Sequence, residues 1–469
     1  MKKIKLSSEY KKMLGDIHTP VGMYLRLRDK YPNSILLESS DYHGNEHSYS
    51  YICCNPIARF EAQDYKVTTQ FPNEEEQITA ISQDNTLINQ LDAFINTFET
   101  DELDLDFVYK GIFGYTGYDS IKYFEDIELK EFESNDRRIP DMLYQVYSII
   151  IVYNHFRDEV CILEHRRDED ERQLDKVISY LENKDFSTFS FTAADDEESN
   201  YTDEQFRDMV KKGIEHSQRG DVFQMVLSRQ FKRSFEGDEF NVYRALRSIN
   251  PSPYLFYFDY GDFKIFGSSP EAQIVIKENE ARIFPIAGTF KRTGNDKQDF
   301  YLARKLFDDP KENSEHVMLV DLARNDLSRH GSEVEVETFK EIQYYSHVIH
   351  MVSQVMGKID EGVTPMQLVA DTFPAGTLSG APKYMAIKLI NKYEDRNRGY
   401  YGGAIGYIGF DKSFNHAIMI RSILSKKKKM YYQAGAGVVA KSEVESELNE
   451  VFNKIGALRS AIKRANDVE

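Results

Sequence analysis

The sequence predicts an α+β fold in which antiparallel sheet dominates and helices pack on the sheets. Strand-like segments come in neighbouring pairs joined by short turns, as at KENE (277–280) and SKKKK (425–429). Helical segments are scattered among these hairpins, and no fixed-period repeat indicates a solenoid or a propeller. Many hairpins with interspersed helices favour an α+β arrangement over a doubly wound parallel sheet.

The composition is that of a soluble globular protein. The 469 residues are 41% hydrophobic and 29% charged, and the length calls for two domains or one unusually large one. The start MKKIKLSSEYKKM has no apolar run behind its lysines, and no later run is long enough for a bilayer, so we expect neither a secretory signal nor a membrane span. Cys53, Cys54 and Cys161 are odd in number and lack metal-ligand spacing, which favours a reducing, cytoplasmic location.

The charge balance excludes some partners. A formal net charge of -18 opposes binding to nucleic acid or to an anionic membrane. It also opposes a dianionic substrate, so any such ligand needs a local basic or metal-bearing pocket. The basic run 426–429 lies between two strand-like segments and is expected to be a solvated hairpin turn.

Residues 1–185 are expected to form a β-rich N-terminal region. They contain the strand-like segments SILLES, YSYIC and YQVYSIIIVY and a helical stretch at 168–182. Residues 186–204 are polar, acidic and rich in serine and threonine, which is typical of a linker or an exposed crossover. We therefore place a domain boundary there.

Residues 205–469 are expected to form a second domain that carries the motifs described below. A Thr-Asp-Glu capping signal predicts a helix from Thr202 to Arg219. Beyond it, strands and helices alternate. The expected helices are 310–329, 366–372, 381–393 and 443–465, and the expected strands are FQMVLSRQF, YLFYFDY, FKIFGS, AQIVIK, ARIFPIAGTF, GGAIGYIGF, HAIMIRSIL and MYYQAGAGVV.

Two pairs of glutamates stand out on predicted helices. Glu312 and Glu315 lie on a face that continues into apolar residues, where carboxylates are costly unless they are paired or bind a metal. Glu447 and Glu450 flank the apolar stripe of the last helix. Two helices that each offer two glutamates could build an oxygen-ligand Mg2+ site, although each pair alone is more often the solvated flank of a helix.

Glycine-containing loops and two other side chains suggest an anion site. The loops GSSP, IAGT, AGTLSGAP, YGGAIG and AGAG end strand-like or helix-like runs, and none matches a Walker A or a dinucleotide fingerprint. Arg421 lies inside an apolar strand, where it would meet a carboxylate or, equally, face solvent. His350 could serve as an acid or base, and a hydrogen-bonded structural role is the simpler interpretation.

Seven motifs between residues 201 and 465 together resemble those of the chorismate-utilising enzymes, and most closely the family of anthranilate synthase component I. In chain order they are GSSPE, PIAGT, SEHVMLVDLARND, AGTLSGAPK, YGGAIGY, IMIRS and AGAGVV. The resemblance implies the antiparallel-sheet-rich chorismate-binding fold of that family. It also implies conversion of chorismate and ammonia to anthranilate and pyruvate, the first step of tryptophan biosynthesis.

The same resemblance implies roles for individual residues. Mg2+ would be held by Glu315 and Glu450, with Glu312 and Glu447 nearby. Glu271 would protonate the leaving C4 hydroxyl, His350 would assist the loss of pyruvate, and Thr377 would belong to the catalytic set. The expected chorismate contacts are Gly288, Thr289, Tyr401, Arg421, Gly435, Ala436 and Gly437.

Two positions distinguish the sister reactions of the family. Isochorismate and salicylate synthases place a water-activating lysine where this chain has Gln224, and aminodeoxychorismate synthases typically place a lysine nucleophile where it has Ala287. Both differences favour ammonia as the nucleophile. An aminodeoxychorismate synthase component I with another nucleophile strategy, and a non-catalytic chorismate or amino-acid sensor, are the alternatives.

Regulation and a partner are implied as well. Glu38 and Ser39 in LLES, with Pro253, Tyr254 and Leu255 in NPSPYLF, resemble a feedback site for L-tryptophan; without the resemblance they would be a strand end and an exposed turn. The chain contains no tryptophan, which suits an enzyme made when that amino acid is scarce. None of the cysteines lies in a glutaminase-like turn, so ammonia is expected to come from a separate glutamine amidotransferase subunit.

Overall fold

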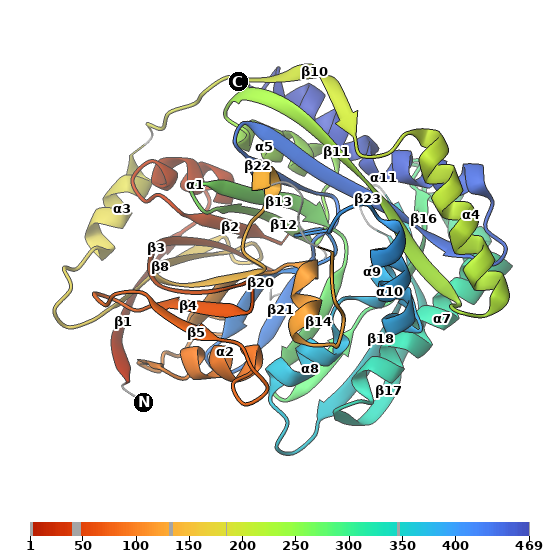
Figure 1. The fold of residues 1–469 in the computed structure, drawn as a ribbon. Coiled ribbons are helices and arrows are strands. Elements are labelled where there is room, and N and C mark those ends of the chain that lie inside the picture. The colour runs from red at the N-terminus through yellow and green to blue at the C-terminus, as the bar shows by residue number, and fades with distance from the viewer. Residues whose placement is uncertain (1–2, 40–47, 131–134, 184, 345–347, 469) are drawn as a thin grey trace.

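The computed structural model describes residues 3–39, 48–130, 135–183, 185–344 and 348–468 (Figure 1). Its core is an antiparallel sheet with two arms that diverge from the long paired strands β3 (Tyr49–Gln63) and β8 (Met142–Asn154). In the described ranges, no helix is both long and apolar enough to cross a membrane.

The first arm extends from β3. Each neighbour in it is antiparallel to the next. Its order is β2 (Ile35–Glu38), β12 (Tyr254–Asp259), β13 (Phe263–Ser269), β22 (Ser422–Lys426), β23 (Lys429–Val439) and β11 (Gln224–Gly237). The short β19 (Gly380–Ala381) and the strand β10 (Phe191–Ser199) also pair with β11.

The second arm extends from β8 and is also antiparallel. Its order is β7 (Gly111–Thr116), β20 (Ala404–Gly409), β21 (Phe414–Ile418), β14 (Ala272–Lys277), β15 (Glu280–Ile283) and β18 (Val348–Ile359), with β16 (Ile286–Lys291) and β17 (Gly331–Tyr344) paired to β18. The peripheral strands are β1 (Ile4–Leu14), β4 (Lys66–Gln70), β5 (Gln77–Ala80), β6 (Phe98–Thr100) and β9 (Glu159–Arg166).

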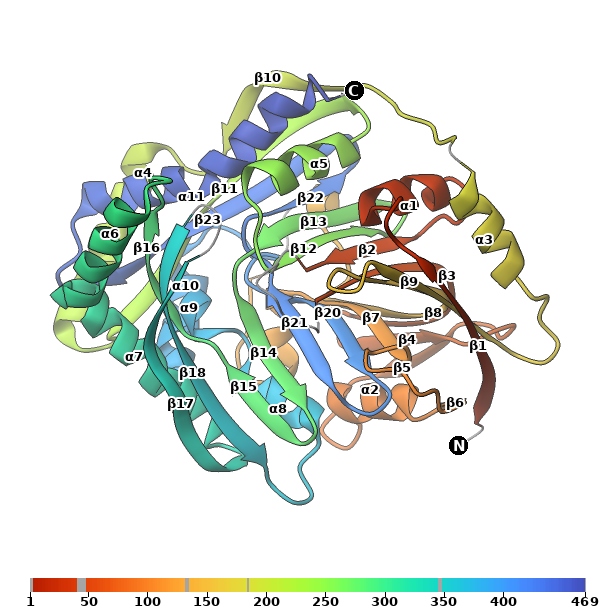
Figure 2. The ribbon, with the colours of Figure 1, turned by 180° about the vertical axis from the view of Figure 1, so that it is seen from behind.

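Helices cover the outer faces of both arms, and an apolar cluster fills the space between the arms (Figures 1 and 2). Over the first arm lie α1 (Pro20–Arg28), α3 (Leu174–Glu182), α4 (Asp203–Arg219), α5 (Phe240–Ile249) and α11 (Val444–Ala465). Over the second lie α2 (Leu87–Ile95), α7 (Pro310–Leu327) and α8 (Pro365–Thr372). The remaining helices are α6 (Asp296–Asp308), α9 (Gly376–Ser379), α10 (Lys383–Tyr393) and the 3-10 turns 118–123 and 135–137.

Local sequence signals explain where several of these elements begin and end. The predicted cap at Thr202 is a complete capping box with Gln205. The predicted helices at 310–329, 366–372, 381–393 and 443–465 correspond to α7, α8, α10 and α11. Lys427 and Lys428 form the exposed turn between β22 and β23 at φ +50° and +58°, which confirms the predicted hairpin.

The predicted linker and domain boundary need correction. Residues 186–204 contain β10, which is polar because it is an outer strand with little of it buried, and a register shift between Ala193 and Glu197 marks a bulge. The boundary does not divide the sheet, because β2 pairs with β12 and β7 pairs with β20. The N-terminal region and the region after residue 205 therefore share one continuous sheet.

Candidate functional site

The predicted catalytic and binding residues come from both arms and from the connections that cross between them. They come from the β13–β14 turn, β16, β18, α9, the turn before β20, the residue before β22, and β23. These segments lie at separate places along the chain. The site is therefore a product of the sheet topology, and strand ends and short loops present its groups.

Glu271 is held rigidly in the turn after β13. Its carbonyl accepts a hydrogen bond from the Ile418 N–H at 2.9 Å, and its own N–H donates to Ser269 Oγ at 3.4 Å. Thr377 Oγ1 of α9 donates to Glu271 Oε1 at 2.9 Å. Burial raises the pKa of Glu271 to about 7, although the Thr377 hydrogen bond and the charges of Lys454 and Arg421 oppose that rise. Glu271 can therefore carry a proton near neutral pH and donate it.

His350 of β18 lies opposite the glycine loop of β16. Its Nδ1 lies 3.1 Å from the carbonyl oxygen of Gly288, so Nδ1 carries the proton of the neutral ring and donates it there. Burial lowers the pKa of His350, and the charge of Arg421 lowers it further. The neutral imidazole is thus favoured at pH 7. Thr289 is the register partner of His350, and its side chain lies outside the described part of the structure.

Arg421 lies close enough to both the acid and the histidine for its charge to lower the pKa values of Glu271 and His350. It is positioned by an unusual backbone conformation, with φ +48° just before β22. Burial lowers the pKa of Arg421, and the nearby Glu271 carboxylate opposes this. An arginine remains charged at neutral pH despite such a shift, so Arg421 is suited to bind a carboxylate.

The AGAG segment, predicted as a loop, lies inside strand β23, where it is paired with β11 and runs beside Tyr401. The hydroxyl of Tyr401 is hydrogen-bonded to the Gly435 backbone, and Lys454 Nζ of α11 donates to the Gly435 carbonyl oxygen at 2.9 Å. A β-carbon on Gly437 would lie 2.3 Å from Gln224 Nε2, so any side chain there would have to displace the amide group of Gln224. Ala436 is buried in the apolar cluster under the first arm and is the ladder partner of Leu227 in β11.

The four glutamates predicted to bind metal lie on α7 and α11. Glu312 Oε2 borders the glycine loop, because a β-carbon on Gly288 would lie 2.9 Å from it. Glu447 is buried, at 3% exposure, and Glu450 Oε1 lies 2.6 Å from Lys454 Nζ. Among the described residues, no three histidine, cysteine, aspartate or glutamate side chains form a cluster that could hold a metal ion. The magnesium site therefore stays a prediction.

A buried ion pair that was not predicted from the sequence stabilises the site. Arg398 Nη2 lies 2.7 Å from Glu394 Oε1, and both side chains are almost fully buried. Arg398 also donates to the carbonyl oxygens of Leu378 in α9 and Val226 in β11, both at 2.7 Å. Opposite charges four residues apart are common on exposed helices, so their spacing does not indicate burial. Lys454, which contacts both Gly435 and Glu450, was likewise not predicted to have a role.

The five residues predicted to form a regulatory site line one cavity of about 270 Å3. Glu38 and Ser39 come from the end of β2, and Pro253, Tyr254 and Leu255 come from β12 and the residue before it. Strand β20 forms the opposite wall with Ile405, Gly406 and Tyr407, shortly after Tyr401 of the catalytic site. The cavity does not include the predicted catalytic residues. Its wall strands β12 and β20 are nevertheless near them in the sequence, because β13, the partner of β12, leads to Glu271 and because Tyr401 precedes β20.

Comparison with known proteins places these features in a family. The profile of the chorismate binding enzymes matches residues 3–460. Anthranilate synthase component 1 of Aquifex aeolicus (strain VF5) is 33% identical over 479 residues, covering 98% of this chain and 95% of the relative. The protein of the same name from Lactococcus lactis subsp. lactis (strain IL1403) is 36% identical over 468 residues, covering 96% of this chain and 98% of the relative.

Solved structures agree. Anthranilate synthase component I from Streptococcus pneumoniae TIGR4 superposes with a TM-score of 0.77 at 30% identity, covering 96% of this chain and 99% of that one. The menaquinone-specific isochorismate synthase of Escherichia coli has a TM-score of 0.75 at 17% identity, covering 98% and 95%, and so shares the fold. The predicted α+β, antiparallel-sheet-rich fold is confirmed.

Proposed function

This chain belongs to the family of chorismate binding enzymes, and from that membership we propose that it catalyses the anthranilate synthase reaction, in which chorismate and ammonia yield anthranilate and pyruvate. The observation that carries the proposal is the grouping of Glu271, Arg421 and His350. A proton donor, a carboxylate-binding cation and a neutral base lie close enough for their charges to act on one another.

The two chemical steps of the reaction give each of these groups a role. Ammonia adds at ring C2 while the C4 hydroxyl leaves, and the hydroxyl departs as water if it receives a proton from Glu271. The C2 proton is then removed and the bond from the ring to the enolpyruvyl oxygen breaks, so that the ring becomes aromatic and the enolpyruvyl group takes up a proton and leaves as pyruvate. His350 assists this second step, and its neutral ring can accept a proton at pH 7. Arg421 and the backbone of the Gly435 segment bind substrate carboxylates.

Magnesium belongs to the proposal. Carboxylate oxygens are the donors Mg2+ prefers, and Glu312, Glu315, Glu447 and Glu450 supply that donor chemistry from two helices. The ion would offset the negative charge of the ring carboxylate and anchor it. Glu450 would have to exchange its ion pair with Lys454 for the metal.

Ammonia, regulation and location complete the proposal. A separate glutamine amidotransferase supplies the ammonia, in keeping with the name component 1 carried by the relatives. L-tryptophan binds the cavity beside Glu38 and inhibits the enzyme. The protein works in the cytoplasm, in keeping with cysteines that are all buried, free thiols.

The proposal is tested with purified protein, chorismate, Mg2+ and ammonium at alkaline pH. We expect anthranilate fluorescence and an equal amount of pyruvate, and we expect Glu315→Ala to abolish both. Glu361→Ala, in an exposed turn, is the matched control and should retain activity. Formation of isochorismate or of 4-amino-4-deoxychorismate in place of anthranilate would contradict the assignment made from Gln224 and Ala287.

A further inference from the structure

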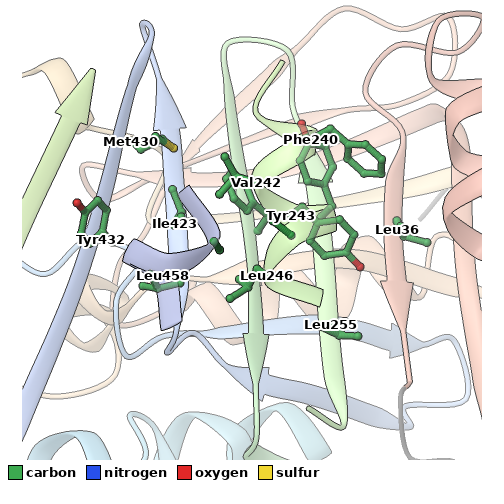
Figure 3. Close-up of a cluster of buried hydrophobic side chains, with 14 of the residues drawn as sticks. Leu36, Phe240, Val242, Tyr243, Leu246, Leu255, Ile423, Met430, Tyr432 and Leu458 are labelled. Carbon is green, nitrogen blue, oxygen red and sulfur yellow. The ribbon is translucent and has the colours of Figure 1, made fainter. Parts of the chain in front are cut away.

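Helix α5 binds the carboxylate of Glu38, which lines the predicted regulatory cavity. Tyr243 Oη donates to Glu38 Oε1 at 2.5 Å, and Arg247 Nε lies 2.9 Å and 3.0 Å from the two oxygens of Glu38. Glu38 is 4% exposed, so these α5 groups replace water around its charge. Figure 3 shows Tyr243 and Leu246 of α5 beside Leu255 of the cavity strand β12. A cationic ligand at Glu38 therefore competes with bonds that fix α5.

The far end of α5 touches a buried serine. Asn250 caps the helix, with its N–H bonded to the Leu246 carbonyl, and its own carbonyl accepts a hydrogen bond from Ser268 Oγ. Asn250 Nδ2 also lies 3.4 Å from Ser268 Oγ. Ser268 is 0% exposed, so its hydroxyl cannot form a replacement hydrogen bond with water if α5 moves.

The same serine is bonded to the backbone of Arg421. The Ser268 N–H donates to the Arg421 carbonyl oxygen at 3.2 Å. Arg421 is held at φ +48°, a region that costs free energy for a residue with a side chain and that persists only when its surroundings impose it. This hydrogen bond is one of those constraints.

A second connection between the cavity and Ser268 runs through the sheet. Leu255, which lines the cavity, is the cross-strand partner of Ser268 in the β12–β13 ladder. Tyr254 is likewise the partner of Ser269, whose hydroxyl is bonded to the backbone of Glu271. Both the helix and the strand that border the cavity therefore converge on the Ser268–Ser269 pair.

We propose that Ser268 is a positioning residue through which occupancy of the cavity beside Glu38 alters the backbone of Arg421, and with it the affinity for a carboxylate substrate. This inference rests on the proposed function. A ligand ammonium that binds Glu38 weakens its bonds to Tyr243 and Arg247 and shifts α5. The shift reaches Arg421 through Asn250 and Ser268. Coupling between two such sites is typically about 5- to 150-fold in affinity.

The test is Ser268→Ala, which removes the hydroxyl and keeps the backbone N–H. Ammonium-dependent turnover gives KM and kcat, and the probe for the cavity is L-tryptophan. The chain has no tryptophan, so all indole fluorescence comes from the ligand and its change on titration with protein gives the Kd. We expect an unchanged Kd for tryptophan, a KM for chorismate raised roughly three- to tenfold with little change in kcat, and tryptophan inhibition weakened by a similar factor.

Ser120→Ala is the matched control, because Ser120 is also 0% exposed and its hydroxyl donates to the Asp141 carbonyl at 2.8 Å. It should leave all three quantities unchanged. If Ser268→Ala binds tryptophan and is inhibited like the wild type, the inference is wrong while the proposed function stands. If the wild type forms no anthranilate, the proposed function fails whatever Ser268 does.

Hydrogen exchange on the wild type decides the matter even where the variant does not fold. Tryptophan should change deuterium uptake in peptides covering 250–256 and 263–270 and leave 118–123 unchanged. Unchanged uptake at the Ser268 amide on tryptophan binding would overturn the inference, because the link to Arg421 would then not respond to the cavity.

Discussion

Thr377 donates a hydrogen bond of 2.9 Å to Glu271, the carboxyl group whose pKa burial raises to about 7. The bond opposes that rise, since it favours the charged carboxylate. The protonation state of the proposed acid is therefore set by a balance between burial, which favours the acid, and the Thr377 hydroxyl with the charges of Lys454 and Arg421, which favour the carboxylate.

This balance predicts the pH dependence of catalysis. The acid form of Glu271 is present below pH 7, so kcat/KM measured at constant free ammonia should fall as the pH rises through about 7. Thr377→Val removes the hydrogen bond, raises the pKa of Glu271 and moves that falling limb to higher pH. Glu271→Gln should lose about 100-fold or more in activity and lack the limb. A Thr377→Val profile that moves to lower pH would show that another group is being titrated.

His350 predicts a separation of the two chemical steps. Its ring is kept neutral by burial and by the charge of Arg421, so the acid limb of kcat should lie below pH 6.5. His350→Asn should slow pyruvate release by about 100-fold or more while the aminated intermediate accumulates, as seen by chromatography with mass detection. His330→Asn, at an exposed histidine paired with Asp371, is the control. Loss of anthranilate without accumulation would place His350 before amination.

The Glu394–Arg398 pair predicts a non-additive effect on stability. Glu394→Gln leaves the buried charge of Arg398 uncompensated and should lower the free energy of unfolding by about 3–5 kcal/mol. The double variant Glu394→Leu with Arg398→Met removes both charges and should cost less than the two single changes together. Denaturant unfolding measures each, with Asp395→Asn at the neighbouring exposed pair as the control. Additive costs would mean that the pair contributes no coupling.

Much of the local structure could be predicted from the sequence, because its causes are local. The Thr202 capping box and the Lys427–Lys428 turn are specified by a few neighbouring residues. The pairings of β2 with β12 and of β7 with β20 could not be predicted. They join strands that are far apart in the chain, and the sequence of a strand does not specify which distant strand it pairs with. The mistaken domain boundary has this origin.

The candidate site was predictable through its motifs rather than its geometry. Two of the seven ordered motifs contain Glu271 and Arg421, and the resemblance that the motifs carry assigned His350 as well; the three prove close enough in the structure for the charge of Arg421 to act on the other two. Arg398 was missed because a buried charge has no periodic signature, and its burial depends on three carbonyl and carboxylate partners from different elements. Ser268 was missed for the same reason, since a serine in GSSPE looks the same whether or not its hydroxyl is buried.

The glycine loop of β16 offers a test that separates backbone strain from steric exclusion. Gly288 has φ +69°, and a β-carbon there would lie 2.4 Å from Leu306 Cδ1 and 2.9 Å from Glu312 Oε2. Gly294 has φ +79° with no heavy atom within 4 Å of its β-carbon position. Both alanine variants incur the backbone cost of about 1 kcal/mol, and only Gly288→Ala also displaces its neighbours.

Gly288→Ala should therefore lower the thermal midpoint by several degrees more than Gly294→Ala. It should also raise the KM for chorismate and the Mg2+ concentration needed for half-maximal activity, because Glu312 and the carbonyl that binds His350 are displaced together. Scanning calorimetry and ammonium-dependent kinetics measure the two effects. Equal midpoints for the variants would mean that Leu306 gives way easily and that glycine is required at residue 288 for its backbone conformation alone.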